Sequence, residues 1–322
     1  MVQCWALGDL AISLPFIRAA QEKYEILLVA KPYAAELVNH LAPLVKHIPL
    51  EAPWTRFRGK YMLHRWPWSD LRNTLAAIRK WRPDVAVSSR WDPRDHLLMV
   101  LSGARKRVGF PRLASRLFLT HPLSYGKELK HKHEDWRLLA NELDLNLPAI
   151  PNLATIRPEN HLPIILHTGA AQKVRVWPLE RYRGLVQRIR SWRIEVRVLC
   201  DHDQLEFWKG TEPSVMAPTT VSELIDALKT GSCFIGNDSG PGHLAAVMGL
   251  PTLTLFGPQL PIWFTPPHPA AEWIEGRVCP YKPCFDYCRF ETPHCLFEIT
   301  EQEVADKVRR CLQKWGITSM DL

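Results

Sequence analysis

Short apolar runs alternate with longer amphipathic stretches along most of the chain. Several of the short runs are apolar at every position, which is typical of parallel strands buried on both faces. The predicted strands are Val2–Ala6, Glu25–Ala30, Val85–Ser89, Ile164–His167, Glu195–Cys200, Cys233–Gly236 and Thr252–Phe256. The predicted helices are Leu10–Lys23, Ser69–Trp81, Lys132–Leu143, Leu179–Trp192, Val221–Thr230, Pro241–Met248 and Glu301–Trp315. This alternation predicts an α/β protein with doubly wound sheets and right-handed crossovers.

The alternating pattern restarts once, after a Pro-rich segment that ends at Pro163. Each half then has its own series of strands and helices. We therefore predict two Rossmann-like domains, over residues 1–155 and 156–322, that face a cleft. The last helix has a capping-box signature, with Thr300 before it and Glu303 three positions on. This helix is also a candidate for packing back on the N-terminal domain.

The composition is that of a globular protein with a basic surplus. Hydrophobic residues make up 46% and charged residues 23% of the chain, and 41 basic against 33 acidic residues give a net charge of +8. The surplus favours an anionic partner such as a phosphosugar or a phospholipid surface. The aromatic residues lack the spacing of RNA-binding motifs, so no nucleic-acid partner is predicted.

The chain has neither a signal-peptide pattern nor an apolar run near the roughly 18 residues of a membrane span. We therefore expect a cytoplasmic protein. Trp54, Trp66 and Trp68, with basic residues beside them, could still hold it peripherally on the inner membrane surface.

Four of the eight cysteines cluster late in the chain, with the spacing C-x4-C-x3-C-x6-C. In a cytosolic protein such a cluster favours a structural metal over disulfides, although paired C-x2-C spacing is more usual for zinc. The alternative is four thiols packed in a Pro-rich loop. The candidate metal ligands are Cys279, Cys284, Cys288 and Cys295.

The most polar junction between a predicted strand and a predicted helix is Asn237–His243, with the sequence Asn-Asp-Ser-Gly-Pro-Gly-His. Free backbone N–H groups at the start of a helix bind anions. A simple N-cap would explain one polar residue here, but not the whole run. We interpret Asp238, Ser239, Gly240 and His243 as a site for a phosphate or a nucleotide sugar.

A second junction of the same kind follows the predicted strand Ile164–His167. Thr168 and Gly169 offer hydroxyl and backbone donors, and Lys173 and Arg175 alternate in a segment that we expect to be extended. Charge-assisted contacts from such groups to a diphosphate are strong. A solvent-facing basic loop is the simpler alternative.

Two carboxylates stand after predicted strands, where open α/β sheets bind ligands. Asp9 follows the first strand and is a candidate general base, although a helix cap is the simpler role for it. Asp203 follows the strand that ends at Cys200 and is a candidate contact for a ribose hydroxyl. The turn at Asp9 lacks G-x-G-x-x-G, so no dinucleotide fingerprint is present.

Taken together, these motifs resemble the lipopolysaccharide heptosyltransferase family, the ADP-heptose-dependent group of GT-B glycosyltransferases. The residues that carry the resemblance are Gly8-Asp9 with Pro15, Arg107–Phe110, Thr168–Ala170 with Trp177-Pro178, Asn237–Ala246, Gly249–Pro251, Phe256–Pro258 and His294–Leu296. The family commonly carries Lys two residues before the Trp-Pro pair, where this chain has Arg175. The start of the chain is also shorter than the family's usual lead-in.

The resemblance implies transfer of heptose from ADP-heptose to an anionic lipopolysaccharide core acceptor, with inversion and without a cofactor required for catalysis. It implies that Asp9 is the base and that the N-terminal domain takes the acceptor. It implies that Asp238, Ser239, Gly240 and His243 contact the donor in the C-terminal domain. The alternatives are a GT-B transferase with another nucleotide-sugar donor or a protein or glycan acceptor, and an inactive relative that only binds a nucleotide sugar.

Overall fold

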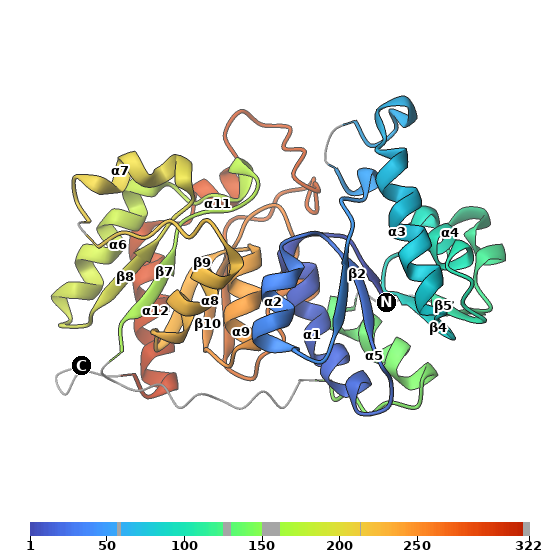
Figure 1. Cartoon of the computed structure of the whole chain (residues 1–322). Helices are drawn as coiled ribbons and strands as arrows, with labels where there is room; N and C mark the ends of the chain where they lie inside the picture. The colour runs from blue at the N-terminus through green and yellow to red at the C-terminus, as the bar shows by residue number, and fades with distance from the viewer. Residues whose placement is uncertain (57–58, 125–129, 150–161, 213, 318–322) are drawn as a thin grey trace. The chain divides into compact units, whose positions relative to one another are not determined.

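The chain folds into two compact units (Figure 1). The computed structural model describes residues 1–56, 59–124, 130–149, 162–212 and 214–317. Unit 1 spans Met1–Ala149 and unit 2 spans Ile150–Leu322. The domain boundary expected between residues 155 and 156 lies in the segment 150–161, outside the described residues.

Unit 1 is built on two three-stranded parallel sheets rather than on one continuous sheet. Their strands, in spatial order, are β1 (Val2–Gln3), β2 (Leu27–Ala30) and β3 (Lys46–Pro49), and then β4 (Val85–Ser88), β5 (Lys106–Gly109) and β6 (His121–Pro122). Strand β1 is shorter than the expected Val2–Ala6 because only Val2 and Gln3 pair with β2. Strands β3, β5 and β6 escaped prediction because Lys, Arg, His and Pro interrupt their apolar pattern.

Helices flank both sheets of unit 1. They are α1 (Leu7–Gln21), α2 (Ala34–Leu41), α3 (Trp68–Trp81), α4 (Pro93–Leu101) and α5 (Lys132–Glu142), with 3₁₀ turns at η1 (Pro53–Thr55), η2 (Leu63–Arg65) and η3 (Leu113–Phe118). Ile78 of α3 and Met99 of α4 share one apolar cluster with Val29 of β2. Helix α1 packs on α5, where the rings of Phe16 and Trp136 lie 5.0 Å apart.

Unit 2 contains one five-stranded, fully parallel sheet. Its strands, in spatial order, are β11 (Ala271–Glu275), β10 (Thr252–Phe256), β9 (Cys233–Asn237), β7 (Ile164–His167) and β8 (Val196–Leu199). Strand β11 was not predicted, because it is an edge strand without fully buried residues. The helices are α6 (Leu179–Ser191), α7 (Leu205–Lys209), α8 (Val221–Lys229), α9 (Gly240–Val247), α10 (Pro261–Phe264), α11 (His294–Phe297) and α12 (Glu301–Trp315), with 3₁₀ turns at η4 (Lys173–Arg175) and η5 (His202–Gln204).

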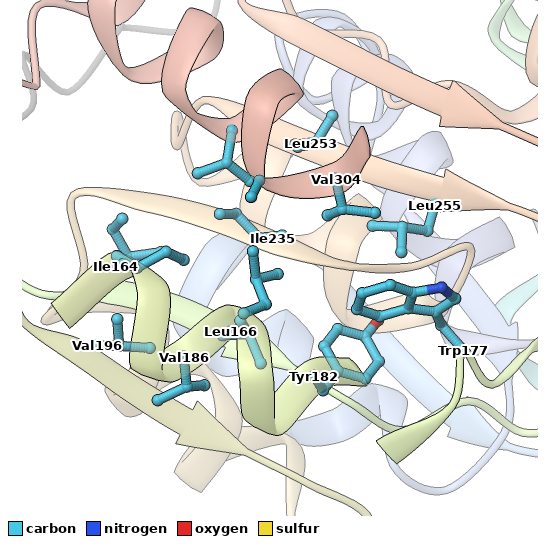
Figure 2. Packing of buried hydrophobic residues seen from close by; sticks show 14 of the residues in the cluster. Ile164, Leu166, Trp177, Tyr182, Val186, Val196, Ile235, Leu253, Leu255 and Val304 are labelled. Atoms are coloured by element: carbon cyan, nitrogen blue, oxygen red, sulfur yellow. The ribbon is translucent and has the colours of Figure 1, made fainter. Parts of the chain in front are cut away.

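Alternate strand residues of unit 2 point into a cluster that α6 and α12 complete (Figure 2). The cluster residues labelled in the figure are Ile164, Leu166, Trp177, Tyr182, Val186, Val196, Ile235, Leu253, Leu255 and Val304. The register places Leu253 beside Ile235, and Ile164 beside both Cys233 and Val196. Burial of this continuous apolar layer is what holds the two helices on the sheet.

The last helix has its place in the core of unit 2. Val304, Val308 and Leu312 of α12 all belong to the buried cluster, so the apolar face of this helix packs within unit 2. The expected capping box is confirmed. Thr300 Oγ1 accepts from Glu303 N at 3.2 Å, and the Glu303 carboxylate accepts from Thr300 N at 2.7 Å.

Replacing Val304 with Ala should lower the free energy of unfolding of unit 2 by about 2 kcal/mol, because two buried methyl groups are lost and a cavity is left. Urea denaturation, monitored by circular dichroism, measures the change in the free energy of unfolding. Val278→Ala is the matched control, since Val278 is 89% exposed and its truncation should cost almost nothing. Equal losses in the two variants would contradict the packing described here.

Candidate functional site

The buried side chain of Asn237, the last residue of β9, ties the ends of two strands together. Its Oδ1 accepts from the Trp177 backbone N–H at 3.1 Å and from the Tyr182 hydroxyl at 2.8 Å. Its Nδ2 donates to the carbonyls of Thr168 at 2.9 Å and Gly169 at 3.3 Å. One amide thereby fixes the turn after β7 relative to β9 and to the start of α6.

Two glycines allow the polypeptide to come close at this edge of the sheet. A Cβ on Gly236 would lie 2.7 Å from the carbonyl oxygen of His167, closer than any side chain tolerates. A Cβ on Gly169 would collide with the carboxylate of Asp201. Gly236 is therefore required by the close approach of β7 and β9, whereas a side chain at position 169 would force the Asp201 carboxylate to move.

The structure corrects the expected direct role of Thr168. Its hydroxyl donates to Gln204 Oε1 at 2.7 Å, and its N–H donates to the Leu199 carbonyl at 2.9 Å. The residue is fully buried. The Thr168 hydroxyl and N–H are therefore both used to hold the turn in place.

Arg175 extends into the same edge and makes two carboxylate contacts. Its Nη1 donates to Asp238 Oδ2 at 3.0 Å, and its Nε and Nη2 donate to the two carboxylate oxygens of Asp286 at 2.7 and 2.8 Å. The expected extended segment is instead the 3₁₀ turn η4, in which residues two apart point in different directions. Lys173 is accordingly exposed, while Arg175 turns inward.

Helix α9 begins directly beside this arginine. Ser239 is its N-cap in position but makes no capping hydrogen bond. Its Oγ is buried and has no hydrogen-bond partner within the part of the chain that the structure describes. Gly240 opens the first turn, and the buried His243 places Nε2 4.0 Å from Asp238 Oδ1. The simple capping role considered for this turn is therefore wrong, and the first N–H groups of α9 lie next to Asp238, the residue that Arg175 binds.

The acidic residue nearest the turn after β7 is Asp201 and not Asp203. Asp203 is exposed, whereas the Asp201 carboxylate packs on Gly169 and accepts from the Ala170 N–H. Burial raises the pKa of Asp201. His167 Nε2 lies 4.0 Å from Asp201 Oδ1. Burial lowers the pKa of the His167 imidazole to about 4, so the ring is neutral near pH 7.

In unit 1, Asp9 lies in the first turn of α1 and is not its N-cap. Ala6 occupies the cap position, and the Asp9 carboxylate accepts from Arg90 Nη1 at 3.0 Å. The Arg90 guanidinium also lies 4.1 Å from the ring centre of Trp5. Arg90 was missed, although it follows β4 as Asp9 follows β1. A half-buried carboxylate paired with one arginine is suited to binding or deprotonating a polar ligand group.

The buried carboxylate of Asp95 contacts Trp5, the residue whose ring packs on Arg90. Asp95 accepts from Trp54 Nε1 at 2.7 Å and from Trp5 Nε1 at 3.4 Å. Burial raises the pKa of Asp95 to about 6. Trp54 is thus an internal residue and not the surface anchor proposed from the sequence. Trp68 is 53% exposed and keeps that role open.

The four clustered cysteines line one small hollow of about 10 Å³ in unit 2. All four are free thiols. Burial raises the pKa of Cys284, and it raises the pKa of Cys295 to about 11. Among the described residues, no group of three or more His, Cys, Asp or Glu side chains is placed to hold a metal ion. Cys279, Cys284, Cys288 and Cys295 are therefore placed as the thiols packed in a loop that were the alternative to the candidate metal set.

Replacing Asn237 with Ala should destabilise unit 2 by about 3 kcal/mol, because it leaves buried donors and acceptors at Trp177, Tyr182 and Thr168 without partners. Thermal and urea unfolding measure this loss. Asn141→Ala is the control, since Asn141 is exposed. A change under about 1 kcal/mol for Asn237→Ala would show that the amide is not the clamp described above.

The chain was compared with protein-family models and with known proteins. The model for glycosyltransferase family 9 (heptosyltransferase) matches residues 90–293, well over half of the chain. No curated protein sequence matches the chain.

Solved structures share the fold at low sequence identity. ADP-heptose LPS heptosyltransferase II of E. coli aligns over 98% of both chains with a TM-score of 0.74 at 19% identity. The E. coli heptosyltransferase WaaC with ADP aligns over 96% of this chain and 98% of its own, with a TM-score of 0.74 at 16% identity. A family 9 glycosyl transferase from Veillonella parvula DSM 2008 aligns over 97% and 96%, with a TM-score of 0.75 at 17% identity. The fold is that of the GT-B heptosyltransferases, and the chain belongs to glycosyltransferase family 9.

Proposed function

We propose that this protein is an inverting glycosyltransferase that moves heptose from ADP-heptose to an anionic acceptor of the lipopolysaccharide core. The observation that carries the proposal is the set of groups at one edge of the unit 2 sheet. There the Arg175 guanidinium, the unpartnered Ser239 hydroxyl and the start of α9 lie together beside the Gly169 turn. Solved relatives in the family are complexes with ADP and with ADP-2-deoxy-2-fluoro heptose.

We assign each protein group at this edge a role in binding the diphosphate of ADP-heptose. Arg175 neutralises charge on the diphosphate, and Ser239 and the first N–H groups of α9 donate hydrogen bonds to its oxygens. Lys173, exposed in the same turn η4 as Arg175, supplies a second cation for the diphosphate. Asp201, beside Gly169, is better placed than Asp203 for a ribose hydroxyl. Preorganised donors of this kind stabilise a leaving diphosphate.

The proposed reaction is a direct displacement that needs no cofactor for catalysis. Asp9 takes the proton from an acceptor hydroxyl as the hydroxyl oxygen bonds to the anomeric carbon. The bond from that carbon to the diphosphate oxygen breaks, and ADP leaves with the bonding electron pair. Arg90, which donates a hydrogen bond to Asp9 in the structure, orients the carboxylate.

The acceptor side of the proposal draws on charge and exposed aromatics in unit 1. Tyr61, Met62, Leu63 and Trp68 are exposed beside the basic residues Lys60 and Arg65. Such a surface suits the headgroup region of an anionic bilayer, and we propose that the protein works in the cytoplasm, peripherally on the inner membrane. Within the described residues, no helix is both long and apolar enough to span a bilayer.

Asp9→Asn should lower heptose transfer at least about a hundredfold, because the amide cannot accept the acceptor's proton. ADP release from purified ADP-heptose and a lipid A core acceptor measures the rate. Asp70→Asn, which removes an exposed carboxylate from the first turn of α3, should leave the rate unchanged. Wild-type turnover by Asp9→Asn would remove Asp9 from the base role.

Arg175→Gln should weaken ADP binding by about tenfold to a hundredfold, since a charged hydrogen bond to the diphosphate is lost. Isothermal titration calorimetry measures the dissociation constant. Arg309→Gln, on the exposed face of α12, controls for the loss of one positive charge. If Arg175→Gln bound ADP like the wild type, the donor site would lie elsewhere.

A further inference from the structure

The loop that carries the clustered cysteines also reaches the donor edge. Asp286 lies in this loop between Cys284 and Cys288, and the loop runs from Gly276 to Pro293 without forming a strand or an α-helix. Asp286 and the residue before it, Phe285, have left-handed backbone angles, with φ of 71° and 50°. This turn presents the Asp286 carboxylate to Arg175, and that carboxylate is 11% exposed.

Asp286 and Arg175 form a bidentate ion pair with two hydrogen bonds. Nε donates to Oδ1 at 2.7 Å and Nη2 donates to Oδ2 at 2.8 Å, while Nη1 is directed to Asp238. Parallel bonds of this type are among the strongest between side chains. All three nitrogens of the guanidinium thus face carboxylates, and two of them face the Cys loop.

A diphosphate on Arg175 would place two or more negative charges beside both carboxylates, which is unfavourable in a partly buried site. Asp238 cannot withdraw, because it is 3% exposed and directly follows β9. Asp286 can withdraw more readily, because the loop that carries it forms neither a strand nor an α-helix. We infer that Asp286 is a latch that occupies Arg175 while the donor is absent and is displaced by the donor diphosphate.

This inference rests on the proposed function and adds a regulated step to it. The latch keeps the inward-facing guanidinium paired when the site is empty. After transfer it competes with the diphosphate of ADP for Arg175, so it favours product release. The apparent affinity for ADP is then reduced by the fraction of molecules in which Asp286 holds Arg175.

Asp286→Asn tests the latch by removing its charge while keeping its shape. Asn suits the left-handed backbone at this position better than Ala does. ADP should bind Asp286→Asn about tenfold more tightly than it binds the wild type, in isothermal titration calorimetry, if the latched state holds about nine molecules in ten. Glu291→Gln, an exposed charge removal in the same loop, should change the dissociation constant little. Unchanged or weaker binding by Asp286→Asn overturns the latch.

Hydrogen exchange on the wild type gives a test that needs no variant. Saturating ADP should speed exchange of the backbone amides around residues 284–288 as Asp286 leaves Arg175, and unchanged or slower exchange overturns the latch. The two proposals fail differently. If Arg175→Gln binds ADP like the wild type, the donor site itself is wrong. If ADP needs Arg175 but Asp286→Asn does not bind it more tightly, only the latch is wrong.

Discussion

The side chain of Asn237 is the contact on which the donor edge of unit 2 depends. It is fully buried, and both ends of its amide are satisfied, with two acceptor and two donor contacts. Such a network is stable because every polar atom has a partner, and it would be costly if one were lost. By holding the turn after β7 against β9, it fixes Gly169 beside the beginning of α9.

Unit 1 uses a comparable device with a carboxylate. Asp95 is fully buried and receives hydrogen bonds from two indoles, Trp54 and Trp5. Trp5 in turn offers its ring face to Arg90, which binds Asp9. In both units, therefore, a buried polar group sits behind the residues proposed to meet substrate and limits their freedom. Preorganisation of this kind reduces the reorganisation that a charged transition state requires.

The guanidinium of Arg175 is partly buried, and two carboxylates compensate its charge. A guanidinium turned away from water needs acceptors, and the structure supplies Asp238 from the end of a strand and Asp286 from a loop. The two acceptors differ in how firmly the fold holds them. That difference is the basis of the proposal that Asp286 leaves Arg175 when a diphosphate binds.

Local pattern alone identified the strands Ile164–His167 and Thr252–Phe256 and the helix Glu301–Trp315 at their observed bounds, because continuous apolar runs and a capping box are encoded by neighbouring residues. It also singled out Asp9, Gly169 and the Asp238–His243 turn, since polar residues after buried strands gather at one sheet edge. The sequence could not show that the hydroxyl of Thr168 is consumed by Gln204, nor that Arg175 meets Asp286, 111 positions away. Those pairings join residues far apart in the chain, so only the packing of the sheet decides them. The strands β3, β5, β6 and β11 also depend on the tertiary structure, because they form by pairing with neighbouring strands and not from their own weak apolar pattern.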